Sequence, residues 1–452
     1  MNMENKPDKY ISERGYTIKK TCLSEEEHNK IKKDLTVSPF TIQGYTNMPT
    51  PKFKVYLESK TKYYLPRFYG ISKFGKVSKN YLEELDHGEN IAQDFNGQLK
   101  EIQVPIASKM IDELKSTGGG ILNLHCGMGK TVLAIYIIAQ MKKKTLIIVH
   151  KEFLMNQWKE RLNQFLPNAK VGIIQQNKVK VENHDVVIAM LQSVAMKSYE
   201  RNIYESFGFT IVDEAHHISS QVFSRALPKI STRYMLGLSA TLDRKDGLRR
   251  VFEWYLGKPT VCVQNMDVGE VVVNVIKLND PQYQVPFYNG NGTLNLAKLI
   301  NTLVISPKRM KIILDWIKKF VKDNRKILVL SERRKHLEDI DLKAKELGLE
   351  CGFYFGGLSQ QKLKESESKQ IILGTYHMIS EGFDLSSLDS LIFASPKTDV
   401  VQATGRILRQ GKNRKTIPTI VDIEDQIDYL KKKSKTRISY YKKNKFTINV
   451  CD

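Results

Sequence analysis

The chain has 452 residues, 41% of them hydrophobic, which allows about three domains with cores of their own, and no stretch reaches the roughly 18 uninterrupted apolar residues of a membrane span. The five cysteines form no C-x-x-C pair and their number is odd, which argues against a zinc site and a disulfide framework. With 71 Lys and Arg against 49 Asp and Glu, the net charge of +22 favours a polyanionic partner, most often nucleic acid, although a lysine-rich solvated surface is the plain alternative.

Residues 1–90 are predicted to form a small N-terminal α+β domain, accessory to the rest and a candidate for nucleic-acid binding. The segment SEEEHNKIKKDL predicts a helix capped by Ser24, with acids first and lysines late. From Pro51 to Gly75 aromatic and basic residues alternate, which is typical of a surface that stacks bases and binds phosphates, and equally of an amphipathic hairpin with one buried aromatic face. The centre of this pattern is Lys54, Tyr56, Lys62, Tyr64, Arg67 and Tyr69.

Residues 91–265 are predicted to form a first α/β domain, in which short apolar runs alternate with helices. The runs are nearly continuous rather than alternating, which fits a parallel sheet covered by helices on both faces. Ligands of such sheets bind at the carboxyl ends of the strands. The predicted strands are Ile121–Leu124, Thr145–Val149, Val186–Ala189, Phe209–Val212 and Met235–Leu238.

The stretch ILNLHCGMGKT, from Ile121 to Thr131, predicts a phosphate-binding loop between a strand and a helix. Two glycines let backbone N–H groups face phosphate oxygens, a lysine reaches the β- and γ-phosphates, and a hydroxyl binds Mg²⁺. Leu124 occupies the first glycine position of the pattern G-x-x-x-x-G-K-S/T, so a chance loop is the alternative on this stretch alone. The predicted ATP-binding loop comprises Cys126, Gly127, Met128, Gly129, Lys130 and Thr131.

Two further strand ends carry candidate chemistry. The apolar run FTIV ends in Asp213 and Glu214, so we expect the first acid to hold Mg²⁺, with Thr131, and the second to orient and deprotonate the attacking water. Later, LGLSATL places Ser239 and Thr241 after a strand, where their hydroxyls could sense the nucleotide, although this stretch alone favours an ordinary strand-to-loop turn.

Beyond residue 265 the chain is predicted to hold three more segments. Residues 266–300 contain two prolines and Asn-Gly-Asn-Gly, which indicates a linker. Residues 301–425 predict a second α/β domain without a phosphate loop, and residues 426–452 a basic C-terminal tail. The strands expected in the second domain are Ile327–Leu330, Gly352–Phe355, Ile371–Gly374, Leu391–Ala394 and Thr419–Asp422.

The second domain offers candidate arginine fingers in VQATGRILR. Arg406 and Arg409 are three residues apart, so on a helix they face the same way. Such arginines, presented to the γ-phosphate, raise phosphoryl-transfer rates by about 10³–10⁵. A pair of surface arginines is the alternative, which Gln402 and Gly405 beside them disfavour.

Taken together, these motifs resemble those of superfamily 2 helicases and translocases over roughly residues 98–425. In the family's order, the chain shows HCGMGKT, HKEFLMNQW, IAMLQSV, VDEAH, LSATL, LVLSERRKHL, GTYHMISEGFDL and QATGRILR. The chain is most similar to the branch of XPB-type and UvsW-type enzymes, and closer still to DEAH-box helicases of large DNA viruses, including the poxvirus transcript-release type. The stretches LSATLDRKDGL, VFEWYLGK and GRILRQGKNRK carry that last similarity.

The resemblance implies two tandem RecA-like parallel-sheet domains with ATP and Mg²⁺ between them. It also implies particular roles for residues that match family motifs. The resemblance implies that Gln103 contacts adenine. It implies that His216, together with Ser239 and Thr241, links the ATP state to nucleic acid. It also implies that Gly382 and Asp384 form a further motif at the nucleotide. Arg244-Lys245-Asp246 stands where XPB-type proteins carry Arg-Glu-Asp, so the role of that element does not carry over.

The implied function is a nucleic-acid-stimulated ATPase that moves along or unwinds DNA, with the strand contacted around Leu154, Gln192 and Thr375. QATGRILR favours DNA over RNA. An RNA helicase, a non-catalytic nucleic-acid-binding scaffold and a restriction-type motor subunit are the alternatives. The intact Lys130, Asp213-Glu214 and Arg409 argue against a scaffold. We expect a soluble, intracellular monomer that does not bind membranes, viral in setting (host cytoplasm or virion) and associated with transcription or repair proteins.

Overall fold

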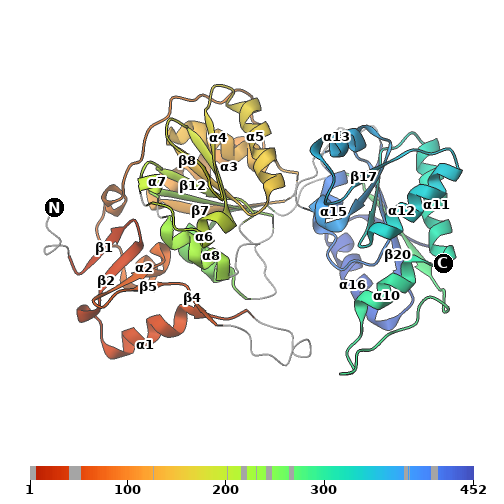
Figure 1. The fold of residues 1–452 in the computed structure, drawn as a ribbon, viewed down its shortest axis with the longest axis horizontal. Coiled ribbons are helices and arrows are strands. Elements are labelled where there is room, and N and C mark those ends of the chain that lie inside the picture. The colour runs from red at the N-terminus through yellow and green to blue at the C-terminus, as the bar shows by residue number, and fades with distance from the viewer. Residues whose placement is uncertain are drawn as a thin grey trace. The chain divides into compact units, whose positions relative to one another are not determined.

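The computed structural model describes residues 7–39, 52–125, 127–200, 202–214, 221–230, 232–240, 247–263, 269–380, 385, 387–408 and 416–451. The chain divides into two compact units, Met1–Gln264 and Asn265–Asp452. Figure 1 shows a sheet flanked by helices in each of them. In the described part of the chain, no helix combines the length and apolarity that crossing a membrane requires.

The N-terminal part of the first unit is built on an antiparallel sheet with the order β1-β2-β6-β5. Helix α1 (Glu25–Asp34) begins where the sequence predicts, because the Ser24 hydroxyl accepts from the backbone N–H of Glu27 and the Glu27 carboxylate accepts from that of Ser24. The remaining elements are β1 (Lys9–Ser12), β2 (Gly15–Lys19), β3 (Thr36–Val37), β4 (Phe53–Lys54), β5 (Leu57–Glu58), β6 (Lys62–Leu65), α2 (Arg67–Phe74) and 3-10 turns at Lys20–Cys22 and Tyr81–Glu84.

The aromatic and basic stretch between residues 51 and 75 is mostly a packing surface. Tyr56, Tyr63 and Tyr69 are buried in the core that the N-terminal sheet shares with the larger sheet of this unit. Arg67, 3% exposed, donates hydrogen bonds to the backbone carbonyls of Gly118, Thr232 and Arg233. The hairpin interpretation is therefore confirmed for the buried aromatic face, and the prediction of Arg67 as a phosphate-binding side chain is wrong.

The first unit's larger sheet has eight strands in the order β10-β9-β11-β8-β12-β13-β7-β14, all parallel except β10. All five predicted strands are present, and β8 (Thr145–Val149) and β12 (Phe209–Val212) are buried along their whole length, as continuous apolar runs require. The other strands are β7 (Gly119–Leu124), β9 (Val171–Gln175), β10 (Lys178–Lys180), β11 (Val186–Met190), β13 (Tyr234–Ser239) and β14 (Pro259–Val263).

Helices connect the strands of this sheet and cover it. Helices α3, α4 and α5 pack beside one another, while α9 packs against β7 and β13. Their bounds are α3 (Gln103–Thr117), α4 (Lys130–Met141), α5 (Glu152–Phe165), α6 (Leu191–Met196), α7 (Asn202–Glu205), α8 (Gln221–Ala226) and α9 (Arg249–Leu256), with a 3-10 turn at Leu227–Lys229.

The second unit has a seven-stranded sheet in the order β17-β18-β16-β19-β20-β15-β21, parallel throughout. The five predicted strands are all present, as β16 (Ile327–Ser331), β17 (Cys351–Tyr354), β18 (Ile371–Thr375), β19 (Ser390–Phe393) and β20 (Thr419–Asp425). The helices are α10 (Leu296–Val304), α11 (Pro307–Lys322), α12 (Arg334–Glu346), α13 (Gln360–Ser368), α14 (Tyr376–Ser380), α15 (Val401–Ile407) and α16 (Asp428–Lys443).

Two apolar cores lie on the two faces of this sheet. Ala403 and Ile407 of α15 and Tyr441 of α16 belong to one core, while Ile313 of α11 and Leu337 of α12 belong to the other. Figure 1 likewise shows α15 and α16 on one side of the second sheet and α11 and α12 on the other.

The segment 266–300 differs from the predicted linker. Strand β15 (Val272–Leu278) lies within it, pairs with β20 over all seven residues and buries Val273 and Val275. The proline and glycine signals belong to the following loop, closed by an antiparallel bridge between Tyr288 and Leu294. The turn residues that follow β15 thus led to a linker being predicted in place of this strand.

The segment 426–452 also differs from the predicted basic tail. Helix α16 buries Leu430, Ser434, Arg437 and Tyr441 on one face, and strand β21 (Thr447–Cys451) then pairs with β15 at the edge of the sheet. Six lysines lie among the remaining positions of α16, so the tail interpretation is wrong for this segment.

Candidate nucleotide-binding site

The phosphate loop joins β7 to α4 through two glycines in a conformation that few other residues adopt. Gly127 has φ 91° and Gly129 has φ 76°, both in the left-handed region that favours glycine. Gly129 precedes Lys130 at the start of α4, and a Cβ there would lie 2.6 Å from Nε2 of Gln103. The loop therefore leads into a helix N-terminus, where free N–H groups and the helix dipole favour anions.

The conformation of Leu124 shows why no glycine is needed at the first glycine position of the pattern. It is the last residue of β7, fully buried, and its φ is negative, so no glycine is needed there. Its carbonyl oxygen accepts a hydrogen bond of 3.3 Å from Nζ of Lys130. The lysine thus folds back over the loop that it closes.

Gln103 is 4% exposed and engages both ends of its amide within the protein. Nε2 donates to the carbonyl of Met128 at 2.8 Å, and Oε1 accepts from the backbone N–H of Lys100 at 2.9 Å. The side chain therefore ties the start of α3 to the phosphate loop. Its contact with adenine stays a prediction.

Asp213 follows β12 directly and is held on three sides. Its Oδ2 accepts from Nε1 of Trp158 at 2.8 Å, its Oδ1 accepts from the backbone N–H of Glu214 at 2.9 Å, and its own N–H donates to the carbonyl of Ile148. Burial, with the neighbouring Glu214 charge, raises the pKa of Asp213 to about 6, although Trp158 and Lys130 act to lower this pKa. Glu214 itself has φ 49°, a strained conformation for a non-glycine residue.

Trp158 is a site residue that the sequence analysis missed. It lies on α5, is 1% exposed, and its indole N–H donates to the carboxylate predicted to hold the metal. HKEFLMNQW ends in this tryptophan, and a buried indole N–H needs a hydrogen-bond partner. An expectation that this motif is buried was therefore the signal that could have pointed to Trp158.

The order of the strands brings the predicted first-unit residues to one edge of the sheet. β13 lies between β12 and β7, so the acid pair, Ser239 and the phosphate loop follow neighbouring strands. Ser239 pairs in register with Asn123 and is completely buried. Parallel strands that end side by side at a ligand edge are the expected setting of a nucleotide site.

The predicted oxygen donors fit Mg²⁺. Thr131 supplies a hydroxyl at the start of α4 and Asp213 a buried carboxylate, and both are hard oxygen ligands of the kind that Mg²⁺ prefers. A carboxylate whose pKa is raised by burial gains most from a cation placed beside it.

In the second unit, α15 carries two of the predicted residues. Gln402 is half-buried and Arg406 is buried, 8% exposed, so Arg406 is not an ordinary surface arginine. Six predicted residues lie outside the described part of the chain, namely Cys126, His216, Thr241, Gly382, Asp384 and Arg409.

The three positions around which we expect contact with a nucleic-acid strand differ in exposure. Gln192 at the start of α6 is exposed and donates to the carbonyl of His150 at 2.9 Å, and Thr375 is half-buried at the end of β18. Leu154 is 5% exposed within α5, because this helix packs its apolar side on the sheet. The Leu154 side chain is thus part of the packing of α5, and a nucleic-acid contact in the segment around it stays a prediction.

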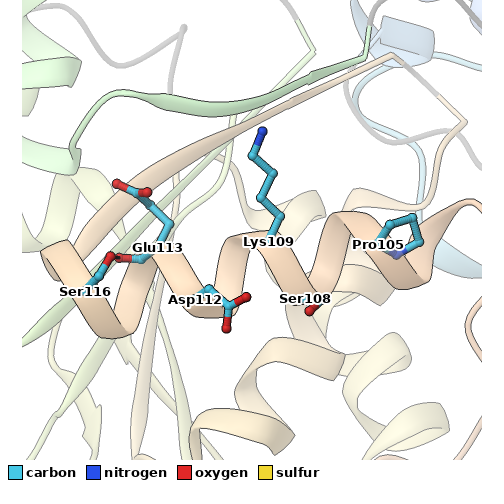
Figure 2. Close-up of a pocket in the computed structure, with 6 residues that line it drawn as sticks. All are labelled: Pro105, Ser108, Lys109, Asp112, Glu113 and Ser116. Atoms are coloured by element: carbon cyan, nitrogen blue, oxygen red, sulfur yellow. Dashed lines mark hydrogen bonds between the residues drawn. The ribbon is translucent and has the colours of Figure 1, made fainter.

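A surface hollow beside α3 is separate from this site. Figure 2 shows that it is lined from α3 alone, by Pro105, Ser108, Lys109, Asp112, Glu113 and Ser116. Gln103, Met110 and Leu114 are buried on the opposite face of the helix. The hollow therefore faces away from the phosphate loop.

Comparison with known proteins agrees with this geometry. The family model described as type III restriction enzyme, res subunit, matches residues 93–244. A protein of Acanthamoeba polyphaga mimivirus, named an ATP-dependent RNA helicase, is 35% identical over 462 residues, covering 99% of this chain and 87% of that protein. A protein of Invertebrate iridescent virus 6, named a helicase, is 30% identical over 379 residues, covering 78% of this chain and 83% of that protein.

Among solved structures, S. cerevisiae Dbp5 bound to RNA and ADP BeF3 has a TM-score of 0.53 at 14% identity, over 77% of this chain and 90% of that chain. This likeness concerns the fold. The phosphate loop, the acid pair and the viral relatives together define a helicase that hydrolyses ATP and acts on nucleic acid. Since the mimivirus relative matches nearly the whole chain, this chain belongs to the superfamily 2 helicases of large DNA viruses.

Proposed function

We propose that this helicase is a Mg²⁺-dependent motor that couples ATP hydrolysis to movement along, or unwinding of, DNA. The observation that carries the proposal is the convergence of the phosphate loop and the Asp213-Glu214 pair at one edge of the first sheet. QATGRILR favours DNA as the polymer. We further propose that the protein acts as a monomer in viral transcription or repair.

The side chains divide the work according to what each can supply. The Thr131 hydroxyl and the Asp213 carboxylate would hold Mg²⁺, which neutralises charge on the β- and γ-phosphates when bound. Lys130 leaves the Leu124 carbonyl and binds the phosphates. Glu214 orients the attacking water and accepts its proton. Arg406 and Arg409, with Gln402, remain predicted to supply positive charge and polar contacts to the γ-phosphate.

RNA is the second candidate polymer, because the mimivirus relative is named an RNA helicase. ATP turnover measured with no polymer, duplex DNA, single-stranded DNA and RNA, each at two salt concentrations, separates the candidates. Strong stimulation by DNA, weaker at high salt, supports the proposal, since contacts to phosphates release counterions. Stimulation by RNA alone would replace DNA with RNA, and no stimulation by any polymer would contradict a nucleic-acid motor.

A further inference from the structure

Helix α16 presents a face of lysines that the motor motifs do not use. Its 16 residues bury one side, at Leu430, Ser434, Arg437 and Tyr441. The opposite side is exposed and carries Lys432, Lys435, Lys442 and Lys443, which we call the lysine face. These lysines recur at helical spacing over 11 positions, about 16 Å at about 1.5 Å per residue.

The lysine face is held in place by a buried charge network. Arg437 donates to the Asp422 carboxylate through Nε and Nη2, both at 2.8 Å, and the Tyr441 hydroxyl donates to the same carboxylate at 2.9 Å. Asp422 and Arg437 are 1% and 4% exposed. A paired, buried arginine fixes the rotation of a helix about its axis, so the lysines point away from the sheet as a defined surface.

The lysine face lacks compensating acids. Residues 429–451 include seven lysines and one arginine but no aspartate or glutamate. Within the described ranges, no ion pair joins Lys432, Lys435, Lys442 or Lys443 to a carboxylate. On α12, by contrast, Lys335, Lys343 and Lys345 each pair with an acid three or four residues away, at 2.7–2.8 Å.

Lys432 and Lys435 are three residues apart, and like charges at this spacing destabilise a helix, so the uncompensated lysine face gains from a bound polyanion. A nucleic-acid strand offers one phosphate per about 3.4 Å of helix axis, so a face about 16 Å long can meet several phosphates. Arg437 also connects the face to the motor, because its Nη1 donates at 2.6 Å to the carbonyl of Lys397, in the loop before α15.

We propose that the lysine face of α16 binds the sugar–phosphate backbone of the nucleic-acid substrate, as a second contact surface beside the motor motifs. This inference rests on the proposed function, because that function supplies the nucleic acid. It concerns phosphates rather than bases, so the surface adds affinity without sequence preference.

The test replaces all four lysines of the face, Lys432→Gln, Lys435→Gln, Lys442→Gln and Lys443→Gln, in the full chain. The matched control replaces four exposed lysines of α11, on the other face of the same sheet, with Gln, namely Lys311, Lys318, Lys319 and Lys322. Both variants lose the same charge, and glutamine keeps helix propensity. A single-stranded DNA oligonucleotide and its duplex are titrated with each protein at several salt concentrations.

We expect the α16 variant to bind more weakly and the slope of log affinity against log salt to fall by about 2 to 3, at about 0.7 per lost phosphate contact on single strands. Turnover of ATP without polymer should be unchanged, and the α11 control should keep the wild-type slope. An unchanged slope in the α16 variant, or an equal loss in the control, would overturn the inference. Neither result touches the proposed function, which is tested separately by the stimulation of wild-type ATP turnover by DNA and by RNA.

Discussion

At the scale of single residues, the site depends on a contact between segments far apart in sequence. Trp158 and Asp213 are 55 positions apart, yet the indole N–H meets the carboxylate at 2.8 Å. A hydrogen bond to a charged group is worth about 1.5–3 kcal/mol, enough to hold the carboxylate in one orientation. We infer that Trp158 positions Asp213 for Mg²⁺.

Replacing Trp158 with phenylalanine keeps an aromatic ring in the core and removes the N–H. We predict that the Mg²⁺ concentration giving half-maximal ATP turnover rises by about tenfold, because loss of about 1.4 kcal/mol weakens Mg²⁺ binding by that factor. The control is Trp316→Phe, since Trp316 lies on α11 and packs against Phe320. Equal Mg²⁺ dependence in Trp158→Phe and the wild type would contradict the positioning role.

The raised pKa of Asp213 predicts a pH dependence. With the pKa at about 6, Asp213 is protonated at lower pH and cannot bind Mg²⁺, so turnover at limiting Mg²⁺ should fall as the pH drops through about 6. Abundant Mg²⁺ favours the carboxylate and should move the fall to lower pH. A profile that stays level down to pH 5 at limiting Mg²⁺ would count against this account.

The raised pKa of Asp213 also predicts how stability changes with pH. Because the folded protein binds the Asp213 proton more tightly than the unfolded chain, whose ordinary value is 3.8, this group lowers stability as the pH rises from about 4 to about 6. Without Mg²⁺ that loss remains at neutral pH, so Mg²⁺ should raise the unfolding temperature more at pH 7.5 than at pH 5.

At the scale of elements, α16 is joined to β20 by the most buried ion pair of the helix. Asp422 accepts two hydrogen bonds from Arg437 and one from Tyr441. Removing one partner of a buried pair leaves the other charge uncompensated, which is strongly destabilising even where the intact pair adds little.

We therefore predict that Asp422→Asn destabilises the second unit by about 3–5 kcal/mol. The matched control is Asp428→Asn at the start of the same helix, where the ion pair with Lys431 spans 3.8 Å and Asp428 is 96% exposed. Urea unfolding followed by circular dichroism should show an earlier transition only for Asp422→Asn. Matching transitions in the two variants would mean that the network does not hold α16.

The helices and strands also show how much of the fold could be predicted from the sequence. All ten predicted strands of the two parallel sheets are present, because a continuous apolar run such as TLIIV can be satisfied only by burial on both faces. β15 was missed because prolines and glycines follow it closely. α16 was interpreted as a tail because lysines dominate its composition. Its buried face includes the polar residues Ser434 and Arg437, so the sequence shows no apolar periodicity there.

Within the candidate site, sequence was sufficient for residues that act through the backbone or lie at strand ends. Gly127, Gly129, Lys130 and Asp213 fall at the predicted edge. Trp158 could not be assigned, since its partner is set by the packing of α5 on the sheet rather than by local spacing.

At the scale of the whole molecule, each unit carries its own parallel sheet, and the chain bears a net charge of +22. A charge of this size attracts nucleic acid over several ångströms and makes the attraction depend on salt. Charge alone does no work on a polymer, however. The claim on which the account rests is that the acid pair at the end of β12 hydrolyses ATP held by the phosphate loop.

The most direct test is the Glu214→Gln variant, assayed for ATP binding and for turnover in the presence of the polymer that best stimulates the wild type. Glutamine keeps the size of the side chain and removes the group that accepts the proton from water. We expect ATP binding close to that of the wild type, with turnover lower by at least about 10²-fold. Turnover within about twofold of the wild type would show that Glu214 is not the catalytic base and would contradict the account.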